Sequence, residues 1–315
     1  MLPDTSAAAI AAHFSLGRDA VLSGPVARGE QGQVWRITTS LGVWAVKELF
    51  TLPTPAEARA DADFQDAVRA AGVPMPAVVR SADGDVLFDL DAALLRVYEW
   101  VDLEEPELGL DPVEVGRVVG VLHGVRVPPS GPVDPWHTEA VGSARWDELV
   151  RALAAVSAPF AADLAAFRDE LVALEGLLEP PRDLQTCHCD LWADNVRITP
   201  TGDLCVIDWE NASPADPSQE LGMVLFEFGS EDPGRARALY DAYVDAGGTG
   251  RIDRPGNFSM AIAQLGHIAE TDCERWLDPT FTDADRTRSV GRFEELTSRP
   301  LTRAVIDQLL AAVAR

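Results

Sequence analysis

Hydrophobic and polar residues follow different periods along this chain. Alternation with a period of two predicts strands that bury one face, whereas apolar residues three and four positions apart predict amphipathic helices. The N-terminal part combines both patterns. It predicts helices at Ser6–Phe14 and Pro55–Ala71, and strands at Leu22–Val26, Val34–Thr38, Val43–Leu49, Val86–Leu90 and Leu94–Val97.

The longer C-terminal part is dominated by helical spacing. Helices are expected at Pro112–Val125, Trp146–Val156, Phe160–Leu178, Leu221–Asp245, Ser259–Trp276, Asp283–Thr297 and Thr302–Ala314. Two short strands interrupt them at Val196–Thr199 and Leu204–Asp208, joined by a turn that contains a glycine. The pattern predicts an α+β chain with a small mixed N-terminal lobe, residues 1–101, and a larger helical C-terminal lobe, residues 102–315.

Four polar residues surround this predicted hairpin: His188, Asp190, Asn195 and Asp208. Asp190 and Asn195 precede the hairpin, and Asp208 closes it. Phosphoryl transfer needs such an arrangement, because one carboxylate receives the hydroxyl proton while an amide oxygen and a second carboxylate hold Mg²⁺. The spacing therefore predicts a kinase, with Asp190 as the catalytic base and with Asn195 and Asp208 as metal ligands.

Lys47 is the single lysine among the 26 lysine and arginine residues of the chain. It stands near the end of a predicted strand, as the phosphate-binding lysine of kinases does. A compact ammonium group suits contact with two adjacent phosphates, and the rigid guanidinium fork does not replace it. One lysine could also survive at a strand edge by chance. The nearby catalytic pattern favours the phosphate role.

Two further segments are candidates for the nucleotide site. Gly29 and Gly32 lie in a loop upstream of Lys47, where glycine allows close approach to phosphate, although the loop could equally be an ordinary hairpin turn. Glu57 and Asp61 lie one turn apart on the following predicted helix. Kinase sites need an acid there to hold the lysine, so either residue could serve and the other would face solvent.

At these positions the chain resembles the aminoglycoside phosphotransferase and choline kinase family, which has the protein-kinase-like fold. His188, Asp190 and Asn195 match its His-Gly-Asp-x₄-Asn loop, with Cys189 in place of glycine, and Asp208 matches its Ile-Asp-Trp-Glu motif. The resemblance implies ATP or GTP as phosphoryl donor, and His188 as a brace of the catalytic loop. Because no Asp-Phe-Gly or Ala-Pro-Glu motif follows, small molecules are expected as acceptors instead of proteins.

The resemblance also indicates where the base and the acceptor bind. The segment from Tyr98 to Val101 resembles the hinge that pairs with the nucleotide base, which places Tyr98 and Trp100 beside it. Tyr98 could favour GTP as a bulky gate, or it could simply pack. Leu122-His123-Gly124 resembles a recurring segment of the family whose histidine is structural.

A helical segment near the C-terminus suggests an amine site. Glu270 and Glu274 share one face, Asp272 lies on another, and Trp276 is close by. Such groups can bind ammonium by ion pairing and cation–π contact, although an exposed acidic helix would look the same. Family members phosphorylate antibiotics, amino alcohols and sugars, so a hydroxylated amine is expected as the acceptor.

Two alternatives to a small-molecule kinase remain. They are a nucleotide-binding pseudokinase and a protein kinase.

Composition limits the partners. The chain has 51 acidic residues against 26 basic ones, and its formal net charge of −25 repels nucleic acid and anionic membranes. No apolar run is long enough to span a bilayer, and the N-terminus lacks the basic start of a secretory signal. We therefore expect a cytoplasmic protein without nucleic-acid, membrane or obligate protein partners.

The four cysteines lack a disulfide-like pattern, which also suits a reducing compartment. Cys187, His188 and Cys189 invite a zinc interpretation, with Cys205 nearby. In an extended segment, however, alternate side chains point to opposite faces, so the histidine and the cysteines would not meet at one ion. The cysteines are expected to be buried as small apolar residues.

Overall fold

The computed structural model describes residues 2, 6–29, 31–230 and 232–314, and the chain divides into two compact units. Unit 1 comprises Met1–Glu107 with Asp194–Glu210, and unit 2 comprises Leu108–Ala193 with Asn211–Arg315. Unit 1 thus extends past residue 101, where the sequence pattern sets the boundary. It also takes in the hairpin that follows the catalytic loop.

Backbone hydrogen bonds explain why this hairpin belongs to unit 1. Its strands, β7 (Val196–Ile198) and β8 (Leu204–Val206), pair in antiparallel register, which confirms the two predicted strands. Val206 N–H donates to Pro74 O (2.8 Å), and Glu104 N–H donates to Ile198 O (2.8 Å). Both partners come from the N-terminal part of the chain, so the hairpin completes unit 1.

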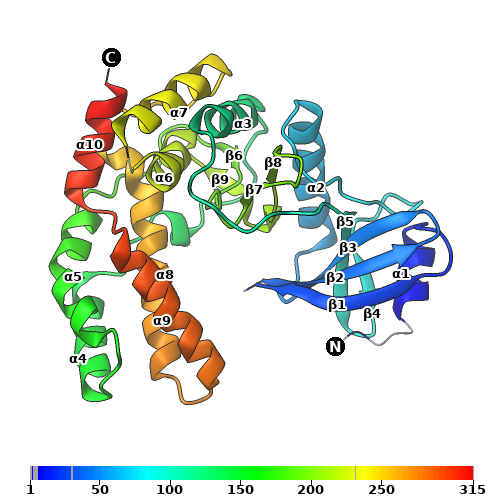
Figure 1. Cartoon of the computed structure of the whole chain (residues 1–315), viewed down its shortest axis with the longest axis horizontal. Helices are drawn as coiled ribbons and strands as arrows, with labels where there is room; N and C mark the ends of the chain where they lie inside the picture. Colours follow the sequence, from blue (N-terminus) through cyan, green and yellow to red (C-terminus); the bar gives the residue numbers. More distant parts are fainter. Residues whose placement is uncertain (1, 3–5, 30, 231, 315) are drawn as a thin grey trace. The chain divides into compact units, whose positions relative to one another are not determined.

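Unit 1 is built around a five-stranded antiparallel sheet with the strand order β1-β2-β3-β5-β4 (Figure 1). The strands are β1 (Val21–Arg28), β2 (Gly32–Thr39), β3 (Gly42–Leu49), β4 (Phe88–Leu90) and β5 (Ala93–Glu99). Each predicted N-terminal strand is confirmed, although β4 is shorter than expected. Directly paired residues point to the same face of a sheet, so the register assigns every side chain to a face.

The two faces of this sheet have different chemistry. Trp35 pairs with Val46, and Val46 pairs with Val97, so these apolar residues share one face. That face forms a core with α1 (Ser6–His13). On the opposite face Lys47 pairs with Arg96, and α2 (Pro55–Ala70) supplies an acid to this side. The sheet therefore separates the core of unit 1 from its charged groups.

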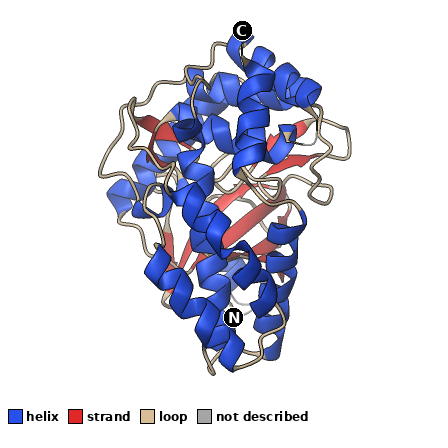
Figure 2. Cartoon of the chain, turned by 90° about the vertical axis from the view of Figure 1, so that its left-hand side faces the viewer, coloured by secondary structure: helices blue, strands red, loops and turns tan. Residues whose placement is uncertain are grey.

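Helices make up most of unit 2 (Figures 1 and 2). They are α3 (Pro112–Gly124), α4 (Ser143–Ala155), α5 (Ala161–Glu175), α6 (Pro217–Gly229), α7 (Pro233–Asp245), α8 (Ser259–Leu277), α9 (Asp283–Ser298) and α10 (Arg303–Val313). Three-residue strands β6 (Gln185–Cys187) and β9 (Ser213–Ala215) form a small antiparallel sheet that the periodicity did not predict. Within the described ranges, each helix falls short of the length and apolarity needed to cross a bilayer.

The structure corrects one predicted helix. The segment Leu221–Asp245 was expected to be continuous, but it is divided between α6 and α7. Asp232 caps α7 by accepting a hydrogen bond from Gly234 N–H, and Pro233 occupies the first turn. Proline lacks the N–H that a helix interior requires, so an aspartate followed by proline starts a new helix.

Small residues on α3 allow α7 to pack closely against it. A Cβ atom on Gly116 would lie 2.1 Å from Leu239 O, and one on Gly120 would lie 2.5 Å from Tyr243 O. Both distances are far below van der Waals contact. The closeness of α3 and α7 therefore depends on glycine at these two positions.

Replacing Gly116 by alanine tests this packing. We expect Gly116→Ala to lower the free energy of unfolding by about 1–3 kcal/mol, because the clash outweighs the better helix propensity of alanine. Gly124→Ala is the matched control in the same helix, since the nearest atom to its Cβ would be Gly247 O at 3.8 Å. Urea unfolding of both variants measures the difference. Equal effects would contradict the close-packing argument.

Candidate active site

The hairpin of unit 1 places two oxygen ligands at one end. Asn195 directly precedes β7, and Asp208 lies two residues after β8. Ile207 N–H donates to Asn195 O (2.9 Å), which holds the two segments together at this end. An amide oxygen and a carboxylate are ligands that Mg²⁺ prefers, so the chemistry of this pair fits the expected metal.

Lys47 is paired with two carboxylates in unit 1. Its Nζ lies 2.6 Å from Asp208 Oδ1 and 2.8 Å from Glu210 Oε2, and its side chain is 11% exposed. Burial alone would lower the pKa of Lys47, but the carboxylates of Glu210 and Asp208 raise it above its ordinary value. The ammonium group is therefore held in its charged form beside Asp208.

The two acids have opposite pKa shifts. Desolvation and the carboxylate of Glu210 raise the pKa of Asp208 to about 7, although Lys47 opposes this. Burial would also raise the pKa of Glu210, but Lys47, a hydrogen bond with Asp208 and the charge of Arg96 keep it well below its usual range. Glu210 is thus the more readily ionised of the two partners of the lysine.

The structure corrects the expectation that a helical acid holds Lys47. Glu57 is exposed and forms a capping box with Thr54 at the start of α2. Asp61 accepts a hydrogen bond from Arg96 Nη1 (2.5 Å). Neither acid reaches the lysine, because Glu210 occupies that place. Glu210 is the last residue of the Ile-Asp-Trp-Glu motif, only two positions after Asp208. This closeness in sequence was the signal that could have identified it as a partner of Lys47.

Tyr98 and Trp100 make contacts within unit 1. The Tyr98 hydroxyl donates to Glu210 Oε1 (3.0 Å) and accepts from Arg96 Nη1 (3.2 Å). Tyr98 therefore faces the same side of the sheet as Lys47. The Trp100 indole N–H donates to Asp102 Oδ1 (2.8 Å), and the Arg36 guanidinium lies over the ring at 5.2 Å from its centroid.

The two glycines of the β1–β2 loop differ in their surroundings. Gly29 N–H donates to Gly32 O (2.9 Å), so the loop closes as a turn. A Cβ on Gly32 would lie 2.5 Å from Glu48 O, whereas one on Gly29 would meet no atom within 4 Å. The approach of β2 to β3 therefore requires glycine at 32, and contacts within the protein do not require it at 29.

In unit 2 the catalytic loop is held through its main chain. Cys189 has φ of 65°, the left-handed conformation that glycine adopts without strain. Its N–H donates to the Glu220 carboxylate, and its carbonyl accepts from Gln264 Nε2 (2.7 Å). The residue after Cys189 is the half-buried Asp190. Its Oδ2 accepts a hydrogen bond from Asn211 Nδ2 (2.9 Å), and this contact orients the carboxylate.

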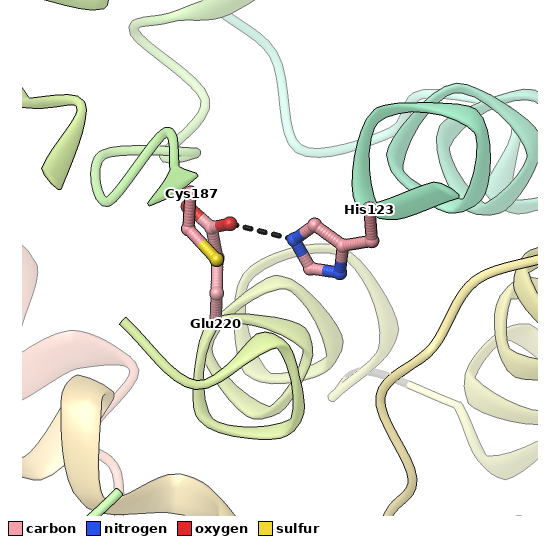
Figure 3. A group of neighbouring side chains, drawn as sticks. All are labelled: His123, Cys187 and Glu220. Atoms are coloured by element: carbon pink, nitrogen blue, oxygen red, sulfur yellow. Dashed lines mark hydrogen bonds and ion pairs between the residues drawn. The ribbon is translucent and has the colours of Figure 1, made fainter. Parts of the chain in front are cut away.

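Glu220 belongs to a buried hydrogen-bonded chain, of which Figure 3 shows the contact between His123 and Glu220. Gly250 N–H donates to the Tyr243 hydroxyl (2.7 Å), and the same hydroxyl lies 2.8 Å from His123 Nδ1. His123 Nε2 carries a proton and donates to Glu220 Oε2 (2.6 Å). His188 is fully buried next to Cys189 in the same loop. These contacts fit the expected bracing role of His188 and the structural role of His123.

His123, Cys187 and Glu220 bring three potential metal-ligand atoms within 4.8 Å of one another. Burial raises the pKa of the Cys187 thiol far above its ordinary value, so the sulfur keeps its proton. Hydrogen bonds already use the facing atoms of His123 and Glu220. The thiolate that a zinc site requires is therefore strongly disfavoured here.

The acids of α8, where an amine site was expected, form ion pairs with arginines of unit 2. Arg145 pairs with Glu270 (Nε–Oε1, 2.8 Å) and also with Glu274. Asp272 is buried and accepts from Arg292 Nε (3.1 Å). Trp276 packs edge-on against Phe160, with ring centroids 5.7 Å apart, in the core between α4, α5, α8 and α9. These groups stabilise helix packing.

The Asp61–Arg96 pair can be tested by removing one charge. Arg96 is nearly fully buried, so Asp61→Asn leaves a buried cation without its carboxylate. We expect a loss of about 3 kcal/mol or more in unfolding free energy. Asp63→Asn is the control, because Asp63 is 73% exposed and pairs with Arg80 at the surface, where a change within about 0.5 kcal/mol is expected. Equal losses in denaturant unfolding would refute the buried pairing.

The ionisation of Glu220 predicts a pH dependence. Burial opposes ionisation, but His123 and the Cys189 N–H keep the pKa of Glu220 below its ordinary 4.5. A carboxyl with a depressed folded pKa stabilises the fold above its unfolded pKa, and this contribution is lost as the pH falls. Glu220→Gln should therefore be less stable by about 1–3 kcal/mol near neutral pH, with a smaller difference below pH 4.5. A difference that stays constant in urea titrations would contradict the ionised state.

Solved structures of small-molecule kinases share this fold. A spectinomycin phosphotransferase in complex with ADP and spectinomycin is 14% identical with a TM-score of 0.70, and the match covers 99% of this chain and 98% of that one. An aminoglycoside phosphotransferase from Alicyclobacillus acidocaldarius is 17% identical with a TM-score of 0.64, covering 99% and 95%. A choline kinase from Streptococcus pneumoniae is 16% identical with a TM-score of 0.56, covering 93% and 98%. These likenesses confirm the expected α+β, protein-kinase-like fold.

Sequence comparison identifies the family. No curated protein matches the chain significantly. The sequence pattern of the phosphotransferase enzyme family, however, matches residues 24–254. The matched region contains Lys47, the catalytic loop and the hairpin that ends before Asp208. The chain therefore belongs to the phosphotransferase enzyme family.

Proposed function

We propose that this phosphotransferase transfers the γ-phosphoryl group of ATP or GTP to a hydroxyl group of a small, amine-containing acceptor. One observation carries the proposal: the only lysine of the chain forms an ion pair with Asp208, beside the Asn195 end of the hairpin. A phosphate-binding cation and two oxygen ligands for a metal are the groups that phosphoryl transfer requires.

The residues have separate roles in this proposal. Asn195 and Asp208 would hold Mg²⁺, which when bound neutralises charge on the nucleotide phosphates. Lys47 would contact the phosphates, and Glu210 keeps its ammonium group charged and in place. Asp190, oriented by Asn211, would position the acceptor hydroxyl and receive its proton late in a loose transition state.

The acceptor class is supported by charge and by likeness. The formal net charge of −25 attracts cationic molecules and repels polyanions. Among the similar structures, one is described with spectinomycin bound and another is a choline kinase. An amine-bearing alcohol, whether antibiotic-like or an amino alcohol, is consistent with both.

Nucleotide turnover tests the proposal. Purified protein should release ADP or GDP in a magnesium-dependent manner when supplied with aminoglycosides, aminocyclitols or small amino alcohols. Asp190→Asn should lower kcat by about 100-fold or more, because the base is lost. Asp183→Asn, an exposed aspartate of unit 2, is the matched control and should be fully active. Full activity in Asp190→Asn would exclude Asp190 as the base.

A further inference from the structure

A carboxylate of α6 holds the main chain of the catalytic loop on the C-terminal side of Asp190. Ala193, three positions after Asp190 and two before Asn195, donates its N–H to Glu227 Oε1 (3.0 Å). The side chain of Glu227 is only 12% exposed, so this acceptor is largely shielded from water. Because Ala193 is the last residue of unit 2 before the chain enters unit 1, the bond fixes the point where the loop leaves unit 2.

The second oxygen of Glu227 is paired with an arginine from near the C-terminus. Arg299 directly follows α9, and its Nη2 lies 2.9 Å from Glu227 Oε2. The same nitrogen donates to the main-chain oxygen of Glu227 (2.9 Å). A charge-assisted contact of this kind restricts the orientation of the carboxylate. Arg299 therefore acts on the catalytic loop through Glu227.

The guanidinium of Arg299 also reaches the preceding residue of the loop through a ring. Arg299 lies over the ring of Phe226, 5.4 Å from its centroid. Phe226 in turn meets the Trp192 ring edge-on, with centroids 6.4 Å apart and planes at 85°. Two adjacent residues of α6 thus contact two adjacent residues of the loop, and Arg299 contacts both residues of α6.

The loop is anchored on both sides of the proposed base. On one side Gln264 Nε2 donates to Cys189 O (2.7 Å), and on the other Glu227 accepts from the Ala193 N–H. Asp190 lies between these anchors, so a shift of either one moves its carboxylate. In a reaction that depends on positioning, a misplacement of about 1 Å can cost about 100-fold in rate.

We propose that Glu227 and Arg299 are positioning residues for phosphoryl transfer. Arg299 aligns the Glu227 carboxylate, which holds the Ala193 N–H. Through this bond the loop keeps Asp190 in place for the acceptor hydroxyl. The inference rests on the proposed kinase function, and it assigns control over the chemical step to the segment that joins α9 to α10.

Amide hydrogen exchange measures the anchor without any substrate. Arg299→Met removes the cation that aligns the carboxylate, and Glu227→Gln removes the charge of the acceptor. We expect the Ala193 amide to exchange about tenfold faster in both variants. Arg303→Met is the control with the same charge change, because Arg303 pairs with Asp307 at the surface, where both side chains are about half exposed. Unchanged exchange at Ala193 in Arg299→Met would overturn the inference.

Kinetics distinguish positioning from general structural support. The acceptor is the one with the highest turnover in the panel of aminoglycosides, aminocyclitols and amino alcohols, at a temperature where circular dichroism shows each variant folded. Arg299→Met and Glu227→Gln should each lower kcat about tenfold or more, with KM for the nucleotide within about twofold of the wild type. Arg299→Lys keeps the charge and should restore part of kcat.

The double variant tests whether Arg299 acts through Glu227. In the Glu227→Gln background, Arg299→Met should lower kcat little further, because both changes disturb one anchor. Additive losses, or a normal kcat despite faster exchange at Ala193, would overturn the inference and leave the kinase function intact. A wild type without turnover on any acceptor would overturn the proposed function, while the exchange data would still decide whether Glu227 anchors the loop.

Discussion

One buried ammonium group organises unit 1. Lys47 on β3 and Asp208 after β8 are 161 positions apart in the chain, and their ion pair joins the sheet to the hairpin. Lys47 contacts both Asp208 and Glu210, and the charge of Arg96 also acts on Glu210. Such a cluster is costly to bury without complete pairing. In unit 1 the pairing joins the sheet strand β3 to the segment after β8.

Local patterns in the sequence were sufficient for most of the architecture. The strands of the sheet, the hairpin and the positions of Asn195 and Asp208 follow from alternation, a glycine-containing turn and the spacing of polar residues. The break between α6 and α7 was also encoded locally, because Asp232 and Pro233 form a helix start that the periodicity alone conceals. Boundaries of this kind depend on capping chemistry more than on hydrophobic spacing.

Charge partners could not be predicted in the same way. The carboxylate that reaches Lys47 comes from Glu210, and the acids of α8 meet arginines on α4 and α9. Each pairing depends on tertiary packing between segments distant in sequence, and an acid on a helix face looks the same whether it binds a ligand or a neighbouring helix. Gln264 belongs to no motif, and its hydrogen bond to the carbonyl of Cys189 becomes visible only in the folded structure.

The lone lysine has a further consequence for the chemistry of the protein surface. Every other basic side chain of the chain, apart from its histidines, is an arginine, so the one ε-amino group is the one buried between Asp208 and Glu210. Acylation requires an unprotonated amine, and these carboxylates keep this amine protonated. Acetylation, ubiquitin transfer and amine-directed cross-linking therefore find no lysine on the outside of this protein. Any reagent that does acylate a lysine here has reached the buried group between Asp208 and Glu210.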